Sequence, residues 1–527
     1  MSRRRFLGSG AALLTVASSR MLLAHASTHP RTREPPTEPF DYARLKGMAR
    51  TLAGQPYRAP STRLPPTISA LDWDHWEAIR FRDDHSLWAD RGLRFQVRFA
   101  HLGFRIDKAV RMFEVAEGQS REILFDPAMF DYTGAGVRAG ELPRNLGFAG
   151  FRVLHHTDWT RDCAAFQGAS YFRAVDGDLQ YGMSHRGLAV NCGLPRPEEF
   201  PDFIAYYLER PERDSSRLTV YGLLDSPSIA GAYRFVIDVD DTLIMDIDAA
   251  LYPRRSIERI GIAPGTSMFL CAKNDRRVAQ DWRPEIHDSD GLQLQTGAGE
   301  WIWRPLVNPA GVRVNSHADE NPRGFGLMQR ERAFDKYEDD GVFYDKRPSV
   351  WVEPKSDWHK GAVMLVEIPT IDETADNIVA FWTPQEPPQS GGEYLYGYRL
   401  YWCRDNPHGP KLATVHATRT GIGGIVGQKR NHFAWRFVVD FTGGELALLA
   451  EHARVLPRIT ASRGRIELVS ARPLRPEGAW RAMFDLALTD DSPEPINLRL
   501  FLALDDQALS ETWLYQYTPP PPAERRI

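Results

Sequence analysis

Apolar and polar residues alternate with a period of two along most of this chain, which predicts β-strands. The stretch YRFVIDVDDTLIMDIDAALY (233–252) predicts two strands joined by a hairpin turn at Asp240-Asp241-Thr242. Further strands are predicted in RLTVYGLL (217–224), GAVMLVEIP (361–369), NIVAFW (377–382) and GYRLYW (397–402). Clusters of Gly, Pro and Asp separate these runs, as turns require. The fold class predicted is therefore all-β.

Helical patterns are confined to two short segments, residues 42–52 and 70–79, and Ser69 is the predicted N-cap of the second. After Trp402 the chain becomes irregular and rich in Pro and Gly, and short strand patterns follow. These are AWRFVVDF (434–441), RIELVSARPL (465–474), WRAMFDLAL (480–488) and INLRLFLAL (496–504). The pattern predicts a large β-sandwich over 41–402 and a small immunoglobulin-like sandwich over 411–520.

The N-terminus, MSRRRFL, carries paired arginines at Arg3 and Arg4, followed by a short apolar run over 8–19. Ala24-His25-Ala26 fits a small-x-small cleavage site. This pattern is typical of a twin-arginine (Tat) signal peptide, predicted over 1–26, with a Pro-rich linker over 27–40. Arg20 interrupts the apolar run, which is too short to span a membrane. We therefore expect a periplasmic protein that is exported through the Tat pathway and does not span the membrane.

Composition narrows the function classes only slightly. The chain has 527 residues, enough for two or three domains, and a formal net charge of −4, which argues against nucleic acid or anionic lipid as partners. Aromatic residues make up 11%, including 14 Trp. Such residues either fill the core of a large sandwich or stack on sugar rings, and composition leaves both open.

Four cysteines, Cys163, Cys192, Cys271 and Cys403, lack CxxC or zinc-like spacing. An oxidising compartment would permit a Cys163–Cys192 disulfide, but four cysteines allow three pairings, and we interpret them as structural. No HExxH motif, calcium loop or histidine cluster is present, so neither a metal nor a cofactor is expected.

The stretch TIDETADNIVAFW (370–382) sets three carboxylates, Asp372, Glu373 and Asp376, before a strongly apolar strand. One interpretation is a solvated turn at the entry to a strand. The other is a carboxyl group held rigidly at the rim of a sheet, where it can act in catalysis.

Several stretches, in order and with similar spacing, resemble those of a known family: LGFAGFRV (146–153), GASYFRAV (168–175), YGMSHRGLAV (181–190), IHDSDGL (286–292), GEWIWRPL (299–306), NPRGFGLMQRERAFDKYED (321–339), KRPSVWVEP (346–354), DNIVAFW (376–382), YRLYW (398–402), RTGIGG (419–424) and SETWLYQY (510–517). The family is that of the periplasmic glucan biosynthesis proteins, the osmoregulated periplasmic glucan proteins G and D. The twin-arginine start favours the D branch.

The resemblance implies a galactose mutarotase-like N-terminal sandwich followed by an immunoglobulin-like domain. It also implies a substrate, β-1,2-glucan, and cleavage of that glucan with inversion of the anomeric centre. Members that transfer the cleaved chain to a sugar hydroxyl and close a ring are the alternative.

The resemblance also implies site residues, because glycoside cleavage needs a general acid and a general base. Asp376 matches the acid, with Glu373 as a like-charged neighbour that raises its pKa. Asp288 matches the base, acting directly or through a relay, and His287 and Asp290 would orient it or bind sugar. An Asx turn is the alternative for both Asp288 and Asp290.

The stretch VFYDKRPSVWVEP (342–354) adds candidates for the relay and for binding of the substrate. Tyr344 would hold a relay water, and Arg347 would bind sugar hydroxyls. Alternation puts Val350 and Val352 on one face of the strand, and Trp351 and Glu353 on a face predicted to line the cleft. Trp351 could equally belong to the core, and Trp301, Trp303 and Trp358 are lesser candidates for sugar stacking.

Two other functions compete with catalysis. The first is a non-catalytic glucan-binding scaffold for the membrane glucan synthase, with the immunoglobulin-like domain as its docking module. The second is a sugar mutarotase, which rests on fold analogy alone. A homodimer is a further partner hypothesis.

Overall fold

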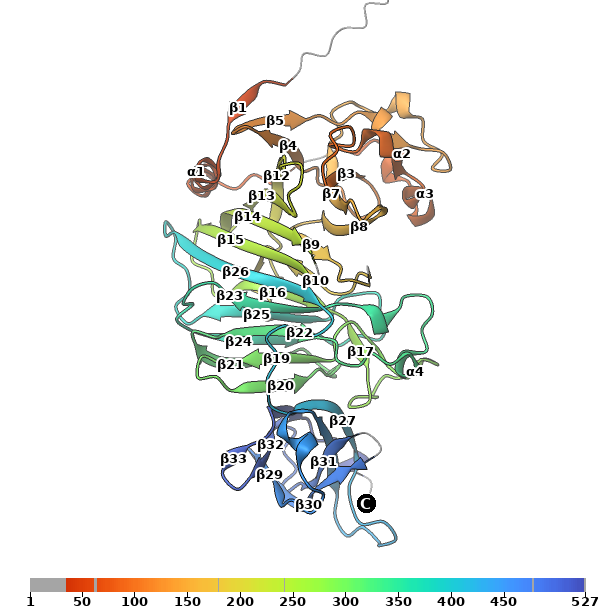
Figure 1. Ribbon diagram of the computed structural model, residues 1–527, viewed down its shortest axis with the longest axis vertical. Helices are drawn as coiled ribbons and strands as arrows, with labels where there is room; N and C mark the ends of the chain where they lie inside the picture. The colour runs from red at the N-terminus through yellow and green to blue at the C-terminus, as the bar shows by residue number, and fades with distance from the viewer. Residues whose placement is uncertain (1–34, 61–63, 179, 241, 476–477, 526–527) are drawn as a thin grey trace, which may run out of the picture. The chain divides into compact units, whose positions relative to one another are not determined.

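β-Strands make up most of the regular structure, as the alternation predicts (Figure 1). The structure, a computed structural model, describes residues 35–60, 64–178, 180–240, 242–475 and 478–525. The predicted signal peptide, the first part of the predicted linker and Asp241 lie outside these residues. The linker ends in strand β1, which pairs with β5. No helix in the described ranges is both long and apolar enough to cross a membrane.

The larger sheet of the described chain has 16 strands in the order β1-β5-β4-β12-β13-β14-β15-β26-β23-β22-β19-β20-β34-β32-β29, with β33 paired to β32. Their bounds are β1 Thr37–Pro39, β4 Arg111–Ala116, β5 Gln119–Ile123, β12 Asp202–Glu209, β13 Arg217–Asp225, β14 Ile229–Val239, β15 Leu243–Pro253, β19 Gly291–Gln295, β20 Trp301–Pro305, β22 Gly324–Met328, β23 Ser349–Pro354, β26 Tyr394–Cys403, β29 Val455–Ala461, β32 Ile496–Leu504, β33 Gln507–Ala508 and β34 Thr512–Tyr517. The predicted hairpin is confirmed, because β14 and β15 pair antiparallel from Ile229↔Pro253 to Val239↔Leu243.

The second sheet of the described chain has 10 strands in the order β21-β24-β25-β16-β10-β9-β8-β7-β3, with β11 paired to β16. Their bounds are β3 Phe95–His101, β7 Phe148–His155, β8 Asp158–Gln167, β9 Tyr171–Ala174, β10 Ser184–Arg186, β11 Leu188–Val190, β16 Ile260–Ser267, β21 Arg313–Glu320, β24 Lys360–Glu367 and β25 Ile378–Pro384. Strand β25 lies between β16 and β24, and both of its faces are buried: Ile378, Ala380 and Trp382 belong to the main core, and Val379 and Phe381 belong to a smaller cluster.

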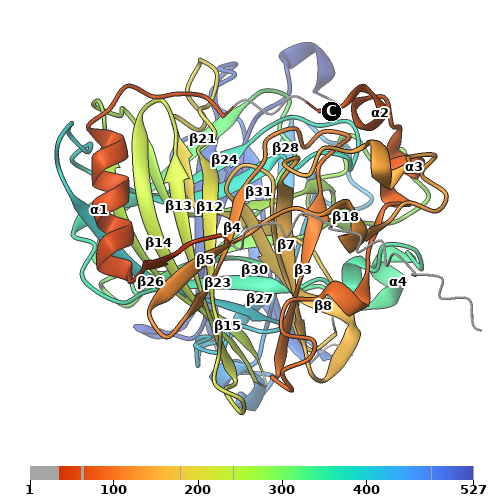
Figure 2. The same ribbon diagram turned by 90° about the horizontal axis from the view of Figure 1, so that it is seen from above.

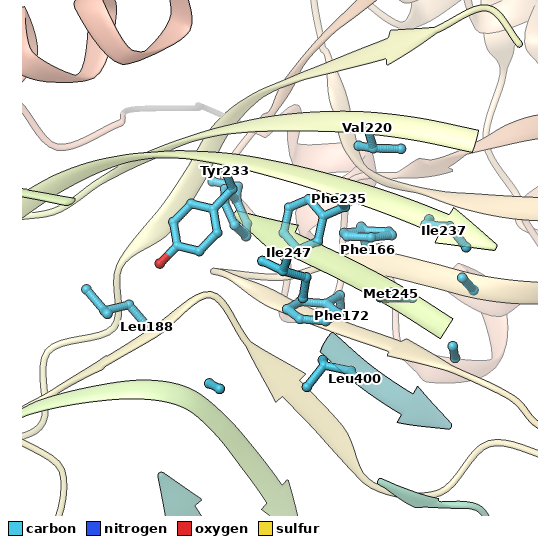
Figure 3. Packing of buried hydrophobic residues seen from close by; sticks show 14 of the residues in the cluster. Phe166, Phe172, Leu188, Val220, Tyr233, Phe235, Ile237, Met245, Ile247 and Leu400 are labelled. Atoms are coloured by element: carbon cyan, nitrogen blue, oxygen red, sulfur yellow. The ribbon is translucent and has the colours of Figure 1, made fainter. Parts of the chain in front are cut away.

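The main core lies between these two sheets (Figure 3). Phe235 of β14 meets Phe166 of β8 and Phe172 of β9, with ring centroids 5.2 Å apart in both pairs. Ile247 and Leu400 extend the same cluster along β15 and β26. Burying each such side chain stabilises the fold by about 1.5–3 kcal/mol. The facing apolar sides make this region a β-sandwich.

Helices are few and short in the described residues. Helix α1 (Tyr42–Ala53) packs on the outer face of β14 (Figure 2). The Tyr42 hydroxyl donates there to the carbonyls of Ala232 (3.1 Å) and Asp248 (3.0 Å). The helix predicted over 70–79 is wrong in its bounds, because Asp72 accepts a hydrogen bond from the His75 backbone (2.9 Å) and starts a separate helix there. The bounds of the remaining helices are α2 Pro66–Ser69, α3 Trp73–Glu77, α4 Phe334–Tyr337, and the 3-10 turns η1 Asp83–His85, η2 Pro127–Met129, η3 Ala139–Glu141, η4 Tyr344–Lys346, η5 Gly444–Leu448 and η7 Pro522–Glu524.

The C-terminal strands take part in two sheets. One is a separate four-stranded sheet, β27-β28-β31-β30, with bounds β27 Thr414–Ile422, β28 Ala434–Thr442, β30 Arg465–Leu474 and β31 Ala479–Ala487. The other strands join the large sheet through parallel pairing of β20 with β34 at Ile302↔Thr512 and Trp303↔Trp513. All four C-terminal strand predictions are confirmed, and hydrogen bonding runs continuously across the predicted domain boundary.

Two small ladders complete the described strands: β2 (Arg80–Phe81) with β6 (Phe130–Asp131), and β17 (Phe269–Cys271) with β18 (Ile286–His287). The four cysteines are buried free thiols.

Candidate functional site

Asp376 lies immediately before β25, on a loop that the next residue holds in place. The Asn377 backbone donates to the Ser267 carbonyl (3.1 Å), and its side-chain oxygen accepts from the Phe269 backbone (2.8 Å). Its side-chain nitrogen donates to the carbonyls of Phe269 (3.0 Å) and Ile368 (2.9 Å). Asn377 is 2% exposed, so these bonds are shielded from water. They fix the point from which the Asp376 side chain leaves the sheet.

Asp288 is attached to the same segment from the other side. It directly follows β18, and its backbone donates to the Met268 carbonyl (2.8 Å). Asp376 is held through Asn377 at Ser267 and Phe269, so residues 267–269 form a common support for both carboxyl groups. Residues 88 positions apart in the chain are thereby brought to one place.

The two carboxyl groups have different environments. Asp288 is only 4% exposed, whereas Asp376 keeps solvent-exposed surface although protein closely surrounds it. Burial, followed by the negative charge of Asp288, raises the pKa of Asp376 to about 6. Burial also raises the pKa of Asp288, and the Arg347 guanidinium, which is ion-paired with it, opposes that rise. Up to about pH 6, Asp376 can therefore hold a proton beside a carboxyl group that is ion-paired with arginine.

Three arginines surround the pair, and two of them escaped the sequence analysis. Arg186, Arg173 and Arg347 all lower the pKa of Asp376 against the effects of burial and Asp288. Arg186 is 2% exposed and donates to Glu198 (2.6 Å), whereas Arg173 is exposed and lies over the ring of Tyr181 (4.7 Å).

The site residues on β9 and β10 were not predicted, because their sequence motifs contain no carboxylate and have the pattern of ordinary strands. Arg186 is the cross-strand partner of Tyr171, and the charge of Asp376 contributes to raising the pKa of Tyr171. Both strands belong to stretches that resemble the family, GASYFRAV and YGMSHRGLAV, which was the available signal.

Turn η4 brings two predicted residues together. The Arg347 guanidinium lies 4.1 Å from the centre of the Tyr344 ring and binds Asp288. The Tyr344 hydroxyl donates to Glu373. The turn thus connects the loop of Asp288 to the loop of Asp376, although Arg347 is engaged by a carboxylate rather than left open for sugar.

Glu373 does not have the predicted effect on Asp376. The like-charged neighbour that raises the pKa of Asp376 is Asp288. Glu373 instead accepts two hydrogen bonds from Arg283 (2.9 and 3.0 Å). The reason is geometric: Asp376 adjoins the strand, whereas Glu373 lies one turn earlier in the loop and points to Arg283.

Arg283 joins three loops at once, and sequence reasoning missed it. Its guanidinium binds Asp281 (2.9 Å), Asp339 (2.8 Å) and Glu373 (2.9 Å). These hydrogen bonds raise the pKa of Arg283, so it stays charged. Next to it, Trp282 is 68% exposed and is the most open tryptophan among the large exposed hydrophobic residues described.

His287 and Asp290 support the backbone instead of facing a ligand. His287 is fully buried, with its ring nitrogens 2.9 Å from Gln329 and 3.2 Å from Glu285. The Asp290 carboxylate accepts from the backbones of Arg330 and Glu331, both at 3.1 Å. Of the two roles predicted for His287, the complete burial of its side chain favours orienting Asp288 over binding sugar.

The predicted cleft wall on β23 is also corrected. The predicted alternation of faces is present, because Val350 and Val352 belong to the main core and Trp351 belongs to a second hydrophobic core. Trp351 is fully buried and stacks on Trp301 with centroids 5.6 Å apart. Its face is covered because the C-terminal strands pack against it, which period-two patterning cannot reveal.

The other residues of this region that were predicted to bind substrate also contact protein or are buried. Glu353 accepts from the Tyr401 hydroxyl (2.7 Å) and lies beside Arg399 (3.8 Å), and both of these partners belong to β26. Trp303 and Trp358 are each 3% exposed. The described residues contain no group of three or more His, Cys, Asp or Glu arranged to hold a metal ion.

Comparison with known proteins agrees with the resemblance. The family model described as "Periplasmic glucan biosynthesis protein, MdoG" matches residues 40–517. "Glucans biosynthesis protein D" of Stenotrophomonas maltophilia (strain K279a) is 60% identical over 484 residues, which cover 92% of this chain and 91% of that protein. The protein of the same name from Xanthomonas axonopodis pv. citri (strain 306) is 56% identical over 534 residues, covering 100% of both chains.

Family membership thus rests on nearly the whole described chain and includes both segments that carry the paired carboxyl groups. The protein belongs to the periplasmic glucan biosynthesis family.

Proposed function

We propose that the protein is a glycoside hydrolase that cleaves β-1,2-glucan with inversion of the anomeric centre. The observation that carries the proposal is the pairing of Asp376, whose pKa burial and Asp288 raise to about 6, with an Asp288 carboxylate that binds Arg347. Inverting glycosidases need one protonated and one ionised carboxyl group. The choice of β-1,2-glucan comes from the family resemblance.

In the proposed reaction, Asp376 gives its proton to the glycosidic oxygen as the bond to the anomeric carbon breaks. The leaving sugar keeps the electron pair as a hydroxyl group. Water attacks the anomeric carbon from the opposite face, and its proton passes to Asp288. Asp376 ends ionised and Asp288 protonated, and proton exchange with solvent restores the pair.

Room for the water sets the expected spacing of the carboxyl groups. Inverting enzymes hold them roughly 6.5–9.5 Å apart, against about 5–5.5 Å in retaining enzymes. We expect Asp288 and Asp376 to stand at the inverting separation, or beyond it, when glucan is bound. A longer path is compatible with a relay through Tyr344 and Glu373, which share a hydrogen bond beside Arg347.

The main test removes the acid. Asp376→Asn keeps the shape of the side chain and abolishes the proton, so cleavage should fall at least ~100-fold while the protein stays folded. The assay is product analysis after incubation with linear β-1,2-glucan. Asp372→Asn, on the exposed part of the same loop, is the matched control. Near-normal cleavage by Asp376→Asn would assign Asp376 to a solvated turn.

The same assay separates the alternatives. Shortened linear chains support hydrolysis, whereas cyclic products show that a sugar hydroxyl replaces water and that the protein is an inverting transglycosylase. Binding without any product supports a non-catalytic scaffold for the membrane glucan synthase. Sedimentation of the purified chain tests the homodimer.

We also propose export through the Tat pathway. The family is described as periplasmic, and Arg3 and Arg4 precede an apolar run that fits a Tat signal. Arg3→Lys with Arg4→Lys should leave unprocessed precursor in the cytoplasm. Normal periplasmic accumulation of this double variant would remove the Tat assignment.

A further inference from the structure

A large cavity, whose lining includes neither Asp288 nor Asp376, lies between two loops of the main sandwich and the C-terminal strands. Its volume is about 750 Å³. One wall comes from residues 273–277 and 307–313, and the other from β27, β28, β34 and the residues that follow β34. This size is in the range of small-molecule binding sites, which combine apolar surfaces with a few polar groups.

Aromatic rings form a continuous row along the C-terminal wall. Trp435 stacks on Tyr517 with centroids 5.8 Å apart and an interplanar angle of 17°. Phe433 stacks on the same tryptophan at 6.3 Å. Trp435 is half-buried, so part of its ring faces the cavity that it lines. Such flat apolar faces suit the C–H faces of pyranose rings.

Three guanidinium groups line the cavity, and two of them, Arg277 and Arg313, form no ion pair with a carboxylate of the described chain. Arg277 donates to the carbonyl oxygens of Asn308 (2.7 Å) and Pro309 (3.0 Å). Arg313 donates to the Gln516 carbonyl (3.2 Å) and to the Thr518 hydroxyl (2.6 Å).

Each guanidinium therefore keeps donors available, since arginine has five N–H groups. Asp275, in the same wall, accepts from the backbones of Arg277 (3.1 Å) and Asn308 (2.9 Å), and its negative charge also acts on Arg313.

We propose that this cavity is a second carbohydrate-binding site, which holds a segment of β-1,2-glucan away from the point of cleavage. The identity of the sugar rests on the proposed function. The aromatic row supplies the stacking surface, and Arg277 and Arg313 supply donors to hydroxyl groups. A polymeric substrate extends beyond the cleavage site, so a second contact would raise its affinity through effective concentration.

The choice of variants follows from the contacts. Arg277 also donates to the Asn308 side chain (3.2 Å), and Asn308 donates to the Thr370 carbonyl (2.9 Å) on the loop that carries Asp376. A change at Arg277 would therefore disturb both sites. No atom lies within 4 Å of the position that a Cβ would take at Gly311, which lines the cavity, so Gly311→Trp adds a bulky side chain to this wall without removing a native contact. Trp435→Ala removes the stacking surface.

The experiment is calorimetric titration of the full chain carrying Asp376→Asn, which prevents turnover, with a short linear β-1,2-gluco-oligosaccharide. We expect two binding equivalents. Adding either Gly311→Trp or Trp435→Ala should leave one. The control is Trp73→Ala, because Trp73 is 50% exposed and lies outside the cavity; it should leave both equivalents.

A single equivalent in the Asp376→Asn chain, or two equivalents that persist in both cavity variants, overturns this inference and leaves the proposed function standing. No binding at all in the Asp376→Asn chain would overturn the proposed function together with the inference.

Discussion

Asp376 and Asp288 show how identical side chains acquire different chemistry from their neighbours. Asp288 is buried and ion-paired with Arg347, whereas Asp376 forms no ion pair with another described residue and is subject to the negative charge of Asp288. Only one of two adjacent carboxyl groups ionises easily. In the proposed mechanism, the ion pair with Arg347 favours the ionised form of Asp288, while burial and the charge of Asp288 favour the protonated form of Asp376.

The first prediction concerns the pH dependence of cleavage. A general acid works only when protonated, and the pKa of Asp376 is raised to about 6. We therefore expect kcat/KM for β-1,2-glucan to fall about tenfold per pH unit above about pH 6. A pH–rate profile checks this. Constant activity up to about pH 9 would exclude Asp376 as the acid.

The second prediction concerns the pH dependence of stability. The raised pKa of Asp376 gives this dependence the opposite sign from that of an aspartate whose pKa is lowered on folding. The pKa of Asp376 is about 6 when folded and 3.8 in the reference state, so between these values the folded chain holds a proton that the unfolded chain has released. The contribution of Asp376 to the free energy of unfolding therefore decreases as the pH rises from 3.8 to about 6.

The Asp376→Asn variant lacks the ionised carboxylate, which is unfavourable in the folded chain. Its Tm relative to wild type should therefore be higher at about pH 8 than at about pH 4. Thermal unfolding at the two pH values measures the difference. An equal Tm difference at both would contradict the raised pKa.

At the scale of elements, the site depends on how β25 begins. Asn377 connects this strand to β17 and to the end of β24 through its side-chain amide. A strand of the sandwich thereby fixes a loop that would otherwise be free, and places Asp376 next to the segment that also supports Asp288.

The third prediction is that Asn377→Ala damages both stability and activity. It leaves the Phe269 N–H and two carbonyls without their partner in a buried place, and each such group costs about 1–3 kcal/mol. Urea denaturation and cleavage assays measure both effects. Thr374→Ala, in the exposed part of the same loop, should change stability by less than about 0.5 kcal/mol. Unchanged stability of Asn377→Ala would show that the amide contacts do not anchor the loop.

At the scale of the whole described chain, the C-terminal strands are tied to the main sandwich by a buried ion pair. Glu511 is 1% exposed and accepts from Arg330 (2.6 Å) and from the Val415 backbone (2.7 Å). The Arg330 guanidinium also lies 3.6 Å from the centre of the Trp303 ring. Together with the pairing of β20 and β34, this contact favours cooperative unfolding of the two regions.

The fourth prediction is that Glu511→Ala destabilises the chain by about 3–5 kcal/mol, because it leaves the Arg330 charge partly buried and unpaired. Glu38→Ala, which removes an exposed pair with Arg44, should cost about 1 kcal/mol or less. Calorimetry should show a single main transition that moves in Glu511→Ala. A second transition that moves alone would mean that the C-terminal strands unfold independently.

The sequence by itself determined the strands, because a period-two pattern expresses which face of each strand is buried. It also identified Asp376 and Asp288 as candidates through the resemblance of short motifs. Helix bounds near residue 70 failed because Ser69, the predicted N-cap, is the last residue of α2, and Asp72 caps the separate helix α3.

Only the tertiary structure decided which side chains meet. Residues 267–269 bring Asp288 and Asp376 together, while Glu373 turns to Arg283. Trp351 lies in a core that forms when the C-terminal strands cover β23, so it is unavailable to a ligand. The physical reason is that alternation reports the two faces of one strand, whereas the partner that covers each face comes from distant parts of the chain.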